Sequence, residues 1–320
     1  MPIHLLPHRQ GAVTRRSALR DFAILSTAAL VPATARSEQS KQRWALLSDT
    51  HIAADPEAES RGINMAEHLR RVVAEVVEEM EGSDGAIDGL IIDGDCAFDD
   101  GQKGDYTLLL EILAPLREKG LPIHFTLGNH DDRDHFYAEA AIAAGDEVVS
   151  GKHVSVIETP FANWVLVDTL RFVNKVEGEL GEAQRKWIAK FLGDHPDKPA
   201  ILVGHHYPQV FRTDVIPSDE EIKISGLVDS EPFFEVLSQF PNASAYLYGH
   251  SHFWRVKTSE SGFHEVNLPP TAYVFDDAKP NGWVLATVDE SGLSLELRAL
   301  DPAHRQHGET KALSWRSKTA

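Results

Sequence analysis

The segment FTLGNHDDRDHF, from Phe125 to Phe136, joins a short apolar run to a cluster of polar side chains. The apolar run ends at a glycine, and an amide, an imidazole and a carboxylate follow at once in Asn129, His130 and Asp131. Taken alone, such a segment is compatible with an ordinary polar turn at the end of a strand. Its meaning depends on whether fragments of the same form occur elsewhere in the chain.

Four other fragments have this form, each with polar side chains directly after an apolar run. They are SDTH with Asp49 and His51, GDC with Asp95, GHHYP with His205 and His206, and GHSH with His250 and His252. Most begin at glycine, which allows the backbone to turn sharply. In open α/β sheets the loops at the carboxyl ends of strands gather along one edge. We therefore expect the five fragments to converge on one site.

The first half of the chain alternates between short apolar runs and segments with helical spacing, which predicts an α/β fold. We predict strands at 43–49, 89–95 and 121–129. Helices are predicted between them at 62–80, where apolar residues recur at helical spacing, and at 105–120, which closes at Gly120.

The second half predicts paired strands on either side of Pro160, a helix at 180–194 and two further buried strands, PAILVGHH and ASAYLYGH. Between those strands lie a polar loop at 209–229 and a helix that begins near Ser230. Two strand pairs end the chain: FWRVKT with FHEVNL, and GWVLATVD with LSLELRAL. No repeat or second boundary interrupts the pattern, so we predict one domain over residues 36–320.

The types of donor side chain indicate metal chemistry. Two aspartates, an asparagine and several histidines form a mixed nitrogen and oxygen set that suits Mn, Zn, Fe or Co and is too rich in nitrogen for Ca or Mg alone. The number of candidates exceeds the three or four protein ligands of a single zinc ion. Two metals roughly 3.5–4 Å apart can bind the attacking and departing oxygens of a phosphate ester. We expect two divalent metal ions.

Charge and cysteine content exclude other classes of protein. The 320 residues include 31 Lys and Arg against 49 Asp and Glu, a net charge of −18. Such a chain has no general attraction for nucleic-acid polymers or anionic membranes, and a pair of cations would supply the positive potential that its surface lacks. The single cysteine, Cys96, excludes an internal disulfide and a thiolate zinc cluster. We interpret it as a small buried residue.

Residues 1–35 resemble a bacterial twin-arginine export signal. Arg15 and Arg16 precede an apolar segment, 22–35, that is too short for a comfortable membrane span, and Ala33-Thr34-Ala35 has the small-residue pattern of a cleavage site. The resemblance implies recognition by the export machinery, a periplasmic or extracellular location and no stable membrane anchor. The alternative is an amphipathic N-terminal helix in which the paired arginines are accidental.

The five fragments together resemble the motif pattern of the calcineurin-like metallophosphoesterases: D-x-H, G-D, G-N-H-[DE], G-H and G-H-x-H. They occur in that order from Asp49 to His252. The resemblance implies a four-layer sandwich, in which helices flank two packed β-sheets, with a dinuclear metal site at the strand ends. The implied ligands of one metal are Asp49, His51 and His252, those of the other are Asn129, His206 and His250, and Asp95 bridges the two.

The same resemblance implies a mechanism in which a metal-bridging hydroxide attacks phosphorus in line. His130 would contact a phosphate oxygen or protonate the leaving alkoxide, with Asp131 orienting its ring. Either histidine of GHHYP fits as a ligand, and the family's usual proline two positions later favours His206 over His205. Asp55, Asn64, Arg133 and Tyr207 are weaker candidates for contact with the substrate.

Motif spacing is closest to the branch of cyclic-nucleotide and glycerophosphodiester phosphodiesterases, so a small-molecule phosphodiester is the expected substrate. The alternative is a phosphomonoesterase of the same family that acts on a nucleotide or sugar phosphate. A more remote alternative is a non-catalytic binding scaffold, which would have lost several ligands, whereas this chain has lost none. The loop 209–229 and the C-terminal hairpins are candidates for covering the site or for a contact in a homo-oligomer.

Overall fold

The computed structural model describes residues 41–82, 86–140, 148–209 and 225–316. The predicted export signal at 1–35 lies outside these residues, as does most of the predicted polar loop at 209–229. In the part of the chain that is described, no helix has both the length and the apolar character needed to cross a membrane.

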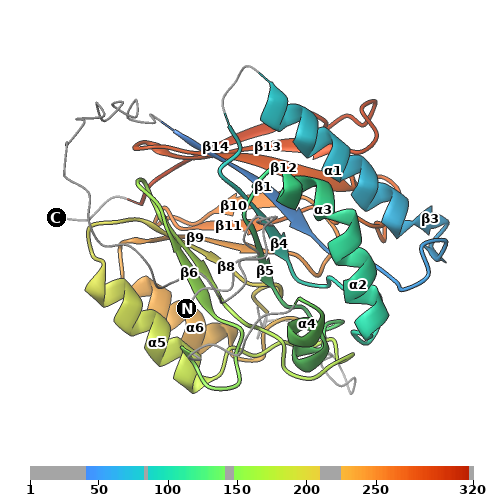
Figure 1. Ribbon diagram of the computed structural model, residues 1–320. Helices are drawn as coiled ribbons and strands as arrows, with labels where there is room; N and C mark the ends of the chain where they lie inside the picture. The colour runs from blue at the N-terminus through green and yellow to red at the C-terminus, as the bar shows by residue number, and fades with distance from the viewer. Residues whose placement is uncertain (1–40, 83–85, 141–147, 210–224, 317–320) are drawn as a thin grey trace, which may run out of the picture.

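Two six-stranded sheets form the centre of the molecule (Figure 1). The first has the order β14 (Thr310–Ser314), β13 (Gly292–Ala299), β12 (Gly282–Val288), β1 (Gln42–Ser48), β4 (Gly89–Asp93) and β5 (Ile123–Thr126). The second has the order β10 (Arg255–Thr258), β11 (His264–Asn267), β9 (Ala243–Tyr248), β8 (Ala200–Val203), β7 (Asn163–Leu166) and β6 (Ser155–Glu158). A short hairpin joins β2 (Glu59–Ser60) to β3 (Ile63–Asn64).

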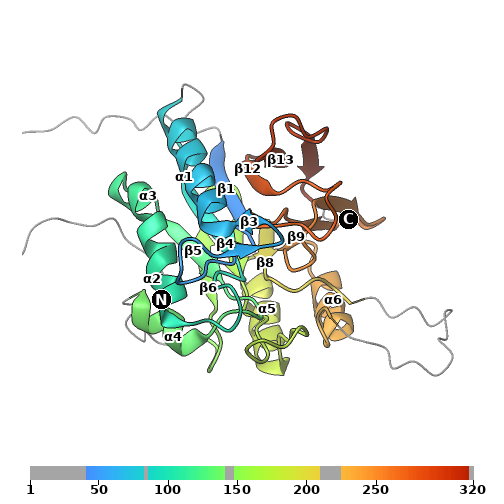
Figure 2. The ribbon, with the colours of Figure 1, turned by 90° about the vertical axis from the view of Figure 1, so that its right-hand side faces the viewer.

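Helices cover the outer faces of the sheets. Those beside the first sheet are α1 (Met65–Glu81), α2 (Lys103–Ile112), α3 (Ala114–Glu118) and α4 (Arg133–Glu139). Those beside the second are α5 (Glu182–Asp194) and α6 (Ser230–Ser238). Figure 2 shows the same separation from the side, with α1 to α4 grouped away from α6.

Three apolar clusters hold these four layers together, and strand β1 shows how. Successive side chains of a strand point to opposite faces, so Ala45 and Leu47 join the cluster under α1 to α3, whereas Trp44 and Leu46 join the cluster between the sheets. A third cluster packs the second sheet against α5 and α6. The predicted four-layer sandwich is confirmed.

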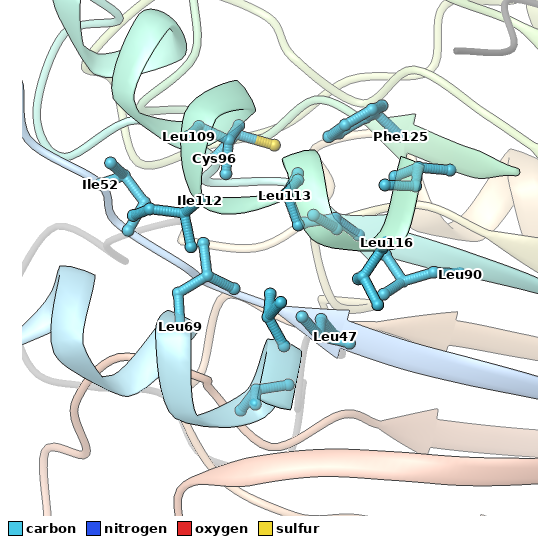
Figure 3. Packing of buried hydrophobic residues seen from close by; sticks show 14 of the residues in the cluster. Leu47, Ile52, Leu69, Leu90, Cys96, Leu109, Ile112, Leu113, Leu116 and Phe125 are labelled. Atoms are coloured by element: carbon cyan, nitrogen blue, oxygen red, sulfur yellow. The ribbon is translucent and has the colours of Figure 1, made fainter. Parts of the chain in front are cut away.

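Cys96 lies within the first of these clusters. Its side chain is fully buried near Leu109 and Phe125, as Figure 3 shows. Burial raises the pKa of its thiol well above the usual range, so the sulfur stays protonated. The interpretation of Cys96 as a small buried residue is confirmed.

The parallel strands place the five fragments together. Strands β1, β4 and β5 are mutually parallel, and so are β7, β8 and β9 in the other sheet. Main-chain hydrogen bonds then join the loops that follow them: His51 N–H donates to Asp95 O at 2.9 Å, and Gly249 N–H donates to His205 O at 3.0 Å. Between the two sheets, His250 N–H donates to Asp49 Oδ1 at 3.1 Å and His205 Nδ1–H donates to Asp93 O at 3.0 Å. The carboxyl ends of both sheets therefore meet at one rim.

Several details differ from the sequence predictions. The single helix predicted at 105–120 is two helices, because Pro115 has no N–H to continue the ladder and its ring disfavours an unbroken helix. The chain after His130 forms α4, which was not predicted. Asp132 caps its N-terminus, because the Asp132 side chain accepts a hydrogen bond from His135 N–H at 2.9 Å. Strand β14 was not predicted. Both predicted C-terminal strand pairs are confirmed as antiparallel.

Candidate metal centre

The loops at this rim have unusual backbone geometry. Seven described non-glycine residues have positive φ, and five of them carry side chains of the predicted site: Asp49 (51°), His51 (46°), Asp95 (44°), His250 (67°) and His252 (54°). A positive φ costs a non-glycine residue free energy, and such residues gather at functional sites when the surrounding structure holds them in place. The strain here turns side chains from separate strands toward a common point.

The first group of donors comes from the loops after β1 and β9. Asp49, His51 and His252 each offer one ligand atom within 4.8 Å of the others. His252 Nε2 lies 3.3 Å from Asp49 Oδ1, and His51 Nε2 lies 3.1 Å from His252 Nε2. Two ligands bound about 2.1 Å from one ion lie roughly 3.0–3.5 Å apart, so these spacings suit a single cation.

The second group is formed by Asp95, His205 and His250. His205 Nε2 lies 3.0 Å from Asp95 Oδ2, and the same carboxylate oxygen lies 3.8 Å from His51 Nε2 of the first group. Asp95 is therefore placed between the two groups. A third, overlapping set of donors consists of His51, Asp95 and His130.

Hydrogen bonds identify which ring nitrogen each histidine leaves for a ligand. The rings of His51, His252 and His205 each donate Nδ1–H to a main-chain carbonyl, at 3.3, 2.7 and 3.0 Å respectively. His250 donates Nε2–H to Ser225 O at 2.7 Å. Because a carbonyl oxygen only accepts, the other nitrogen of each ring, when the ring is neutral, faces the site with a lone pair. This is the usual arrangement around histidine metal ligands.

Two buried polar atoms support the same conclusion. Asn129 Oδ1 and His205 Nε2 are buried and have no hydrogen-bond donor among the described residues. An acceptor left in this state is costly unless a proton or cation satisfies it. A methyl group on Gly128 would lie 2.2 Å from Asp95 Oδ1 and 2.7 Å from His205 Cδ2. The loops are thus packed closely around the donors, and the donor set fits divalent metal ions.

Burial and charge set the protonation of the metal-free site. Burial lowers the pKa of His51 to about 3 and that of His250 to about 4, so both rings are neutral. Burial would also lower the pKa of His205, but the carboxylates of Asp95 and Asp49 outweigh it and raise that pKa to about 10. Without a metal, a proton on His205 is therefore the cation that balances these carboxylates.

His130 lies at the edge of the cavity, with its ring 5.2 Å from that of His51. Its main-chain N–H donates to Asp95 Oδ1 at 2.9 Å, and its ring Nδ1 contacts Asp99 O at 2.5 Å. The orienting contact expected from Asp131 is thus made by the Asp99 carbonyl oxygen.

Asp131 instead ties the loops to one another. Its buried carboxylate accepts hydrogen bonds from the main-chain N–H groups of Cys96, Ala97 and Gly128, at 3.1, 3.0 and 2.8 Å. Burial raises the pKa of Asp131 to about 6, despite these bonds. Its role is to hold the loops after β4 and β5 in register.

His206 lies outside the three groups of donors. Its Nδ1 contacts Thr169 Oγ1 at 2.7 Å, and its ring stands 4.7 Å from that of His250. Nε2 of His206 is also buried without a partner among the described residues. The structure therefore gathers His205 with Asp95 and His250, in the place that the proline spacing had assigned to His206.

A cavity of about 630 Å³ opens over the two groups of donors. Tyr207, one of the weaker sequence candidates, lines it, whereas Arg133 is engaged with buried Asp168 through bonds of 2.7 Å. Sequence reasoning missed Asn174, Tyr273 and Phe275, which also line the cavity. No motif marks them, because they follow strands or turns whose proximity to the site depends on the tertiary fold.

Comparisons with a family model and with known proteins identify the same family. The model of the calcineurin-like phosphoesterase family matches residues 43–253. The chain is 24% identical over 233 residues to the 3′,5′-cyclic adenosine monophosphate phosphodiesterase CpdA of Haemophilus influenzae, covering 72% of this chain and 76% of that protein. It is 25% identical over 264 residues to CpdA of Escherichia coli K12, covering 82% of this chain and 87% of that protein.

A solved structure has a similar fold. A dimetal phosphatase from Danio rerio superposes with a TM-score of 0.63 at 15% identity, over 86% of this chain and 99% of that one. At this identity the likeness supports the fold alone.

Proposed function

We propose, on the premise that this chain belongs to the calcineurin-like phosphoesterase family, that it is a metal-dependent hydrolase of small-molecule phosphodiesters. The observation that carries the proposal is the set of four histidines, His51, His205, His250 and His252. Each gives one ring N–H to a main-chain carbonyl and presents its other nitrogen toward two buried carboxylates. Such a set has no evident purpose in a purely structural core.

The proposed ligands form two sets that share Asp95. Asp49, His51 and His252 would hold one divalent ion, and Asn129, His205 and His250 would hold the other; Mn, Zn, Fe and Co all suit these donors. Bound ions of this kind lower the pKa of water and supply positive charge toward a phosphate group. The protein's own contribution is to keep the two sets in register, through the strained loops and their main-chain hydrogen bonds.

We propose His205 as the ligand in preference to His206. His205 Nε2 lies 3.0 Å from Asp95 Oδ2, and its ring is packed against Gly94 and Gly128. If this assignment is correct, His205→Ala loses one equivalent of bound metal, measured by elemental analysis, and His206→Ala retains two. The reverse pattern would restore the assignment made from the proline spacing.

His130 is proposed to act on the substrate. Its ring lines the cavity beside the donors, and the contact from Nδ1 to Asp99 O fixes the ring plane. Nε2 is then available to a phosphate oxygen or to the leaving alkoxide, as a general acid requires.

Preference for diesters is supported by the relatives, several of which are cyclic-nucleotide phosphodiesterases by name. The test is to purify the protein without added metal, determine its metal content, and then measure hydrolysis of a paired aryl phosphodiester and monoester with Mn or Zn. We expect faster turnover of the diester, and loss of both activities in Asp95→Ala. Asp194→Ala, at an exposed aspartate in α5, is the matched control.

The outcomes separate the alternatives. Faster turnover of the monoester would identify a phosphomonoesterase. If the metal-loaded protein hydrolyses neither ester, the catalytic proposal fails, and a binding scaffold becomes the better account.

We also propose that residues 1–35 direct export to the periplasm or beyond, on the basis of Arg15, Arg16 and the apolar segment that follows. Replacing both arginines by lysine in the full chain should retain the protein in the cytoplasm. Unchanged export of that variant would argue against the twin-arginine route.

A further inference from the structure

A short aromatic segment packs against the first group of donors. We call it the aromatic strap and define it by Tyr273 and Phe275, which follow β11 in the chain. The main-chain N–H groups of Thr271 and Ala272, just before the strap, donate to Ser48 O and Asp49 O at 2.8 and 3.1 Å. The strap is thereby tied to the end of β1, where one of the metal-binding loops begins.

The strap contacts both histidines of the first group. Tyr273 O accepts from His252 Nδ1 at 2.7 Å. The Tyr273 ring stacks on His51 with centroids 5.1 Å apart and an interplanar angle of 25°. The Phe275 ring stacks on His252 at 4.3 Å and 18°. Stacking by two neighbouring side chains of one segment therefore fixes the orientation of two imidazole rings that come from distant parts of the chain.

The exposure of Phe275 is otherwise hard to explain. This residue is 56% exposed, which is unusual for a large apolar residue in the described part of the chain. The Arg61 guanidinium lies 4.8 Å from the centroid of Phe275 and 5.9 Å from that of Tyr273. A cation over an aromatic ring is attracted to it, so Arg61 and His252 together fix the position of Phe275.

We propose that Tyr273 and Phe275 are positioning residues, which hold His51 and His252 in the orientation that binds the first metal ion. This inference rests on the proposed function, because it presupposes that the two histidines bind a metal. Groups that hydrogen-bond to a metal ligand typically change metal affinity by about 10–100-fold when they are removed, whereas one aromatic contact changes it by about 2–12-fold. The side chain of Phe275 is the more direct test, since the strap's main-chain contact to His252 remains when that side chain is truncated.

The experiment compares Phe275→Ala with Phe275→Trp and with a matched control, Phe172→Ala. Phe172 is another exposed phenylalanine, 58% accessible, with the Arg171 guanidinium 5.2 Å from its ring centroid. Binding of Mn²⁺ and Co²⁺ to chelator-treated protein would be followed by calorimetry, and the Co²⁺ absorption spectrum would report ligand geometry. Thermal unfolding of each metal-free variant would report any general loss of stability.

Because the main-chain hydrogen bond to His252 remains, we expect Phe275→Ala to weaken one of the two binding steps by about 2–12-fold, the size of one aromatic contact, and to alter the Co²⁺ spectrum. Phe275→Trp and Phe172→Ala should bind both ions as the wild type does. Unchanged affinity and spectrum in Phe275→Ala would overturn the positioning role, as would an equal loss in Phe172→Ala or a metal-free unfolding temperature that falls along with the affinity. Wild-type protein that binds no metal at all would instead refute the proposed function.

Discussion

Substitution of Gly128 by alanine tests whether close packing of the loops is what holds the donors. Gly128 does not have positive φ, so the added methyl group acts through contact alone. That Cβ would lie 2.2 Å from Asp95 Oδ1 and 2.4 Å from Asp95 N. Since an ordinary contact needs 3.4 Å, the loops after β4 and β5 must separate by roughly 1 Å. A misplacement of that size can cost about 100-fold in rate, which corresponds to about 2.7 kcal/mol in activation free energy.

The experiment measures kcat/KM for hydrolysis of an aryl phosphodiester at saturating Mn²⁺, and the thermal unfolding of the same protein. We expect Gly128→Ala to fold, with about 1–3 kcal/mol less stability from overpacking, and to lose about 100-fold in activity. The matched control is Gly193→Ala in α5, where the new Cβ would meet only Phe240 Cε1, at 3.6 Å. The control should keep full activity, because its methyl group displaces nothing. Full activity in Gly128→Ala would refute the packing argument.

Three further results are expected. His130→Ala should slow hydrolysis of alkyl esters by about 10²–10⁴-fold and of nitrophenyl esters far less, because a good leaving group needs no acid; equal losses would contradict that role. Arg133→Ala leaves buried Asp168 without its bidentate partner, so the free energy of unfolding measured in urea should fall by about 3–5 kcal/mol. The control Lys119→Ala, at an exposed ion pair, should lower it by at most about 1 kcal/mol. Chelation of bound metal should lower the unfolding temperature, since a ligand at 100 times its Kd stabilises by about 2.7 kcal/mol; a temperature independent of chelator would exclude a tightly held ion.

The sequence was informative about the fold because its signals are local. Apolar runs such as 89–95 and the helical spacing of 62–80 determine which segments become buried strands and amphipathic helices, whatever surrounds them. The prediction that proved wrong is also local in origin, because Pro115 divides the helix predicted at 105–120.

The sequence by itself determined the kinds of donor side chain in this protein and their place after buried strands, because residue type and order along the chain are enough to predict both. Only the tertiary structure decided which donors share a point: the ring of His205 turns toward Asp95, whereas that of His206 turns to Thr169. Likewise, nothing in the order of residues places Phe275 against His252. Such contacts depend on positive φ angles, on hydrogen bonds between loops and on the packing of two sheets, and each joins residues that are distant along the chain.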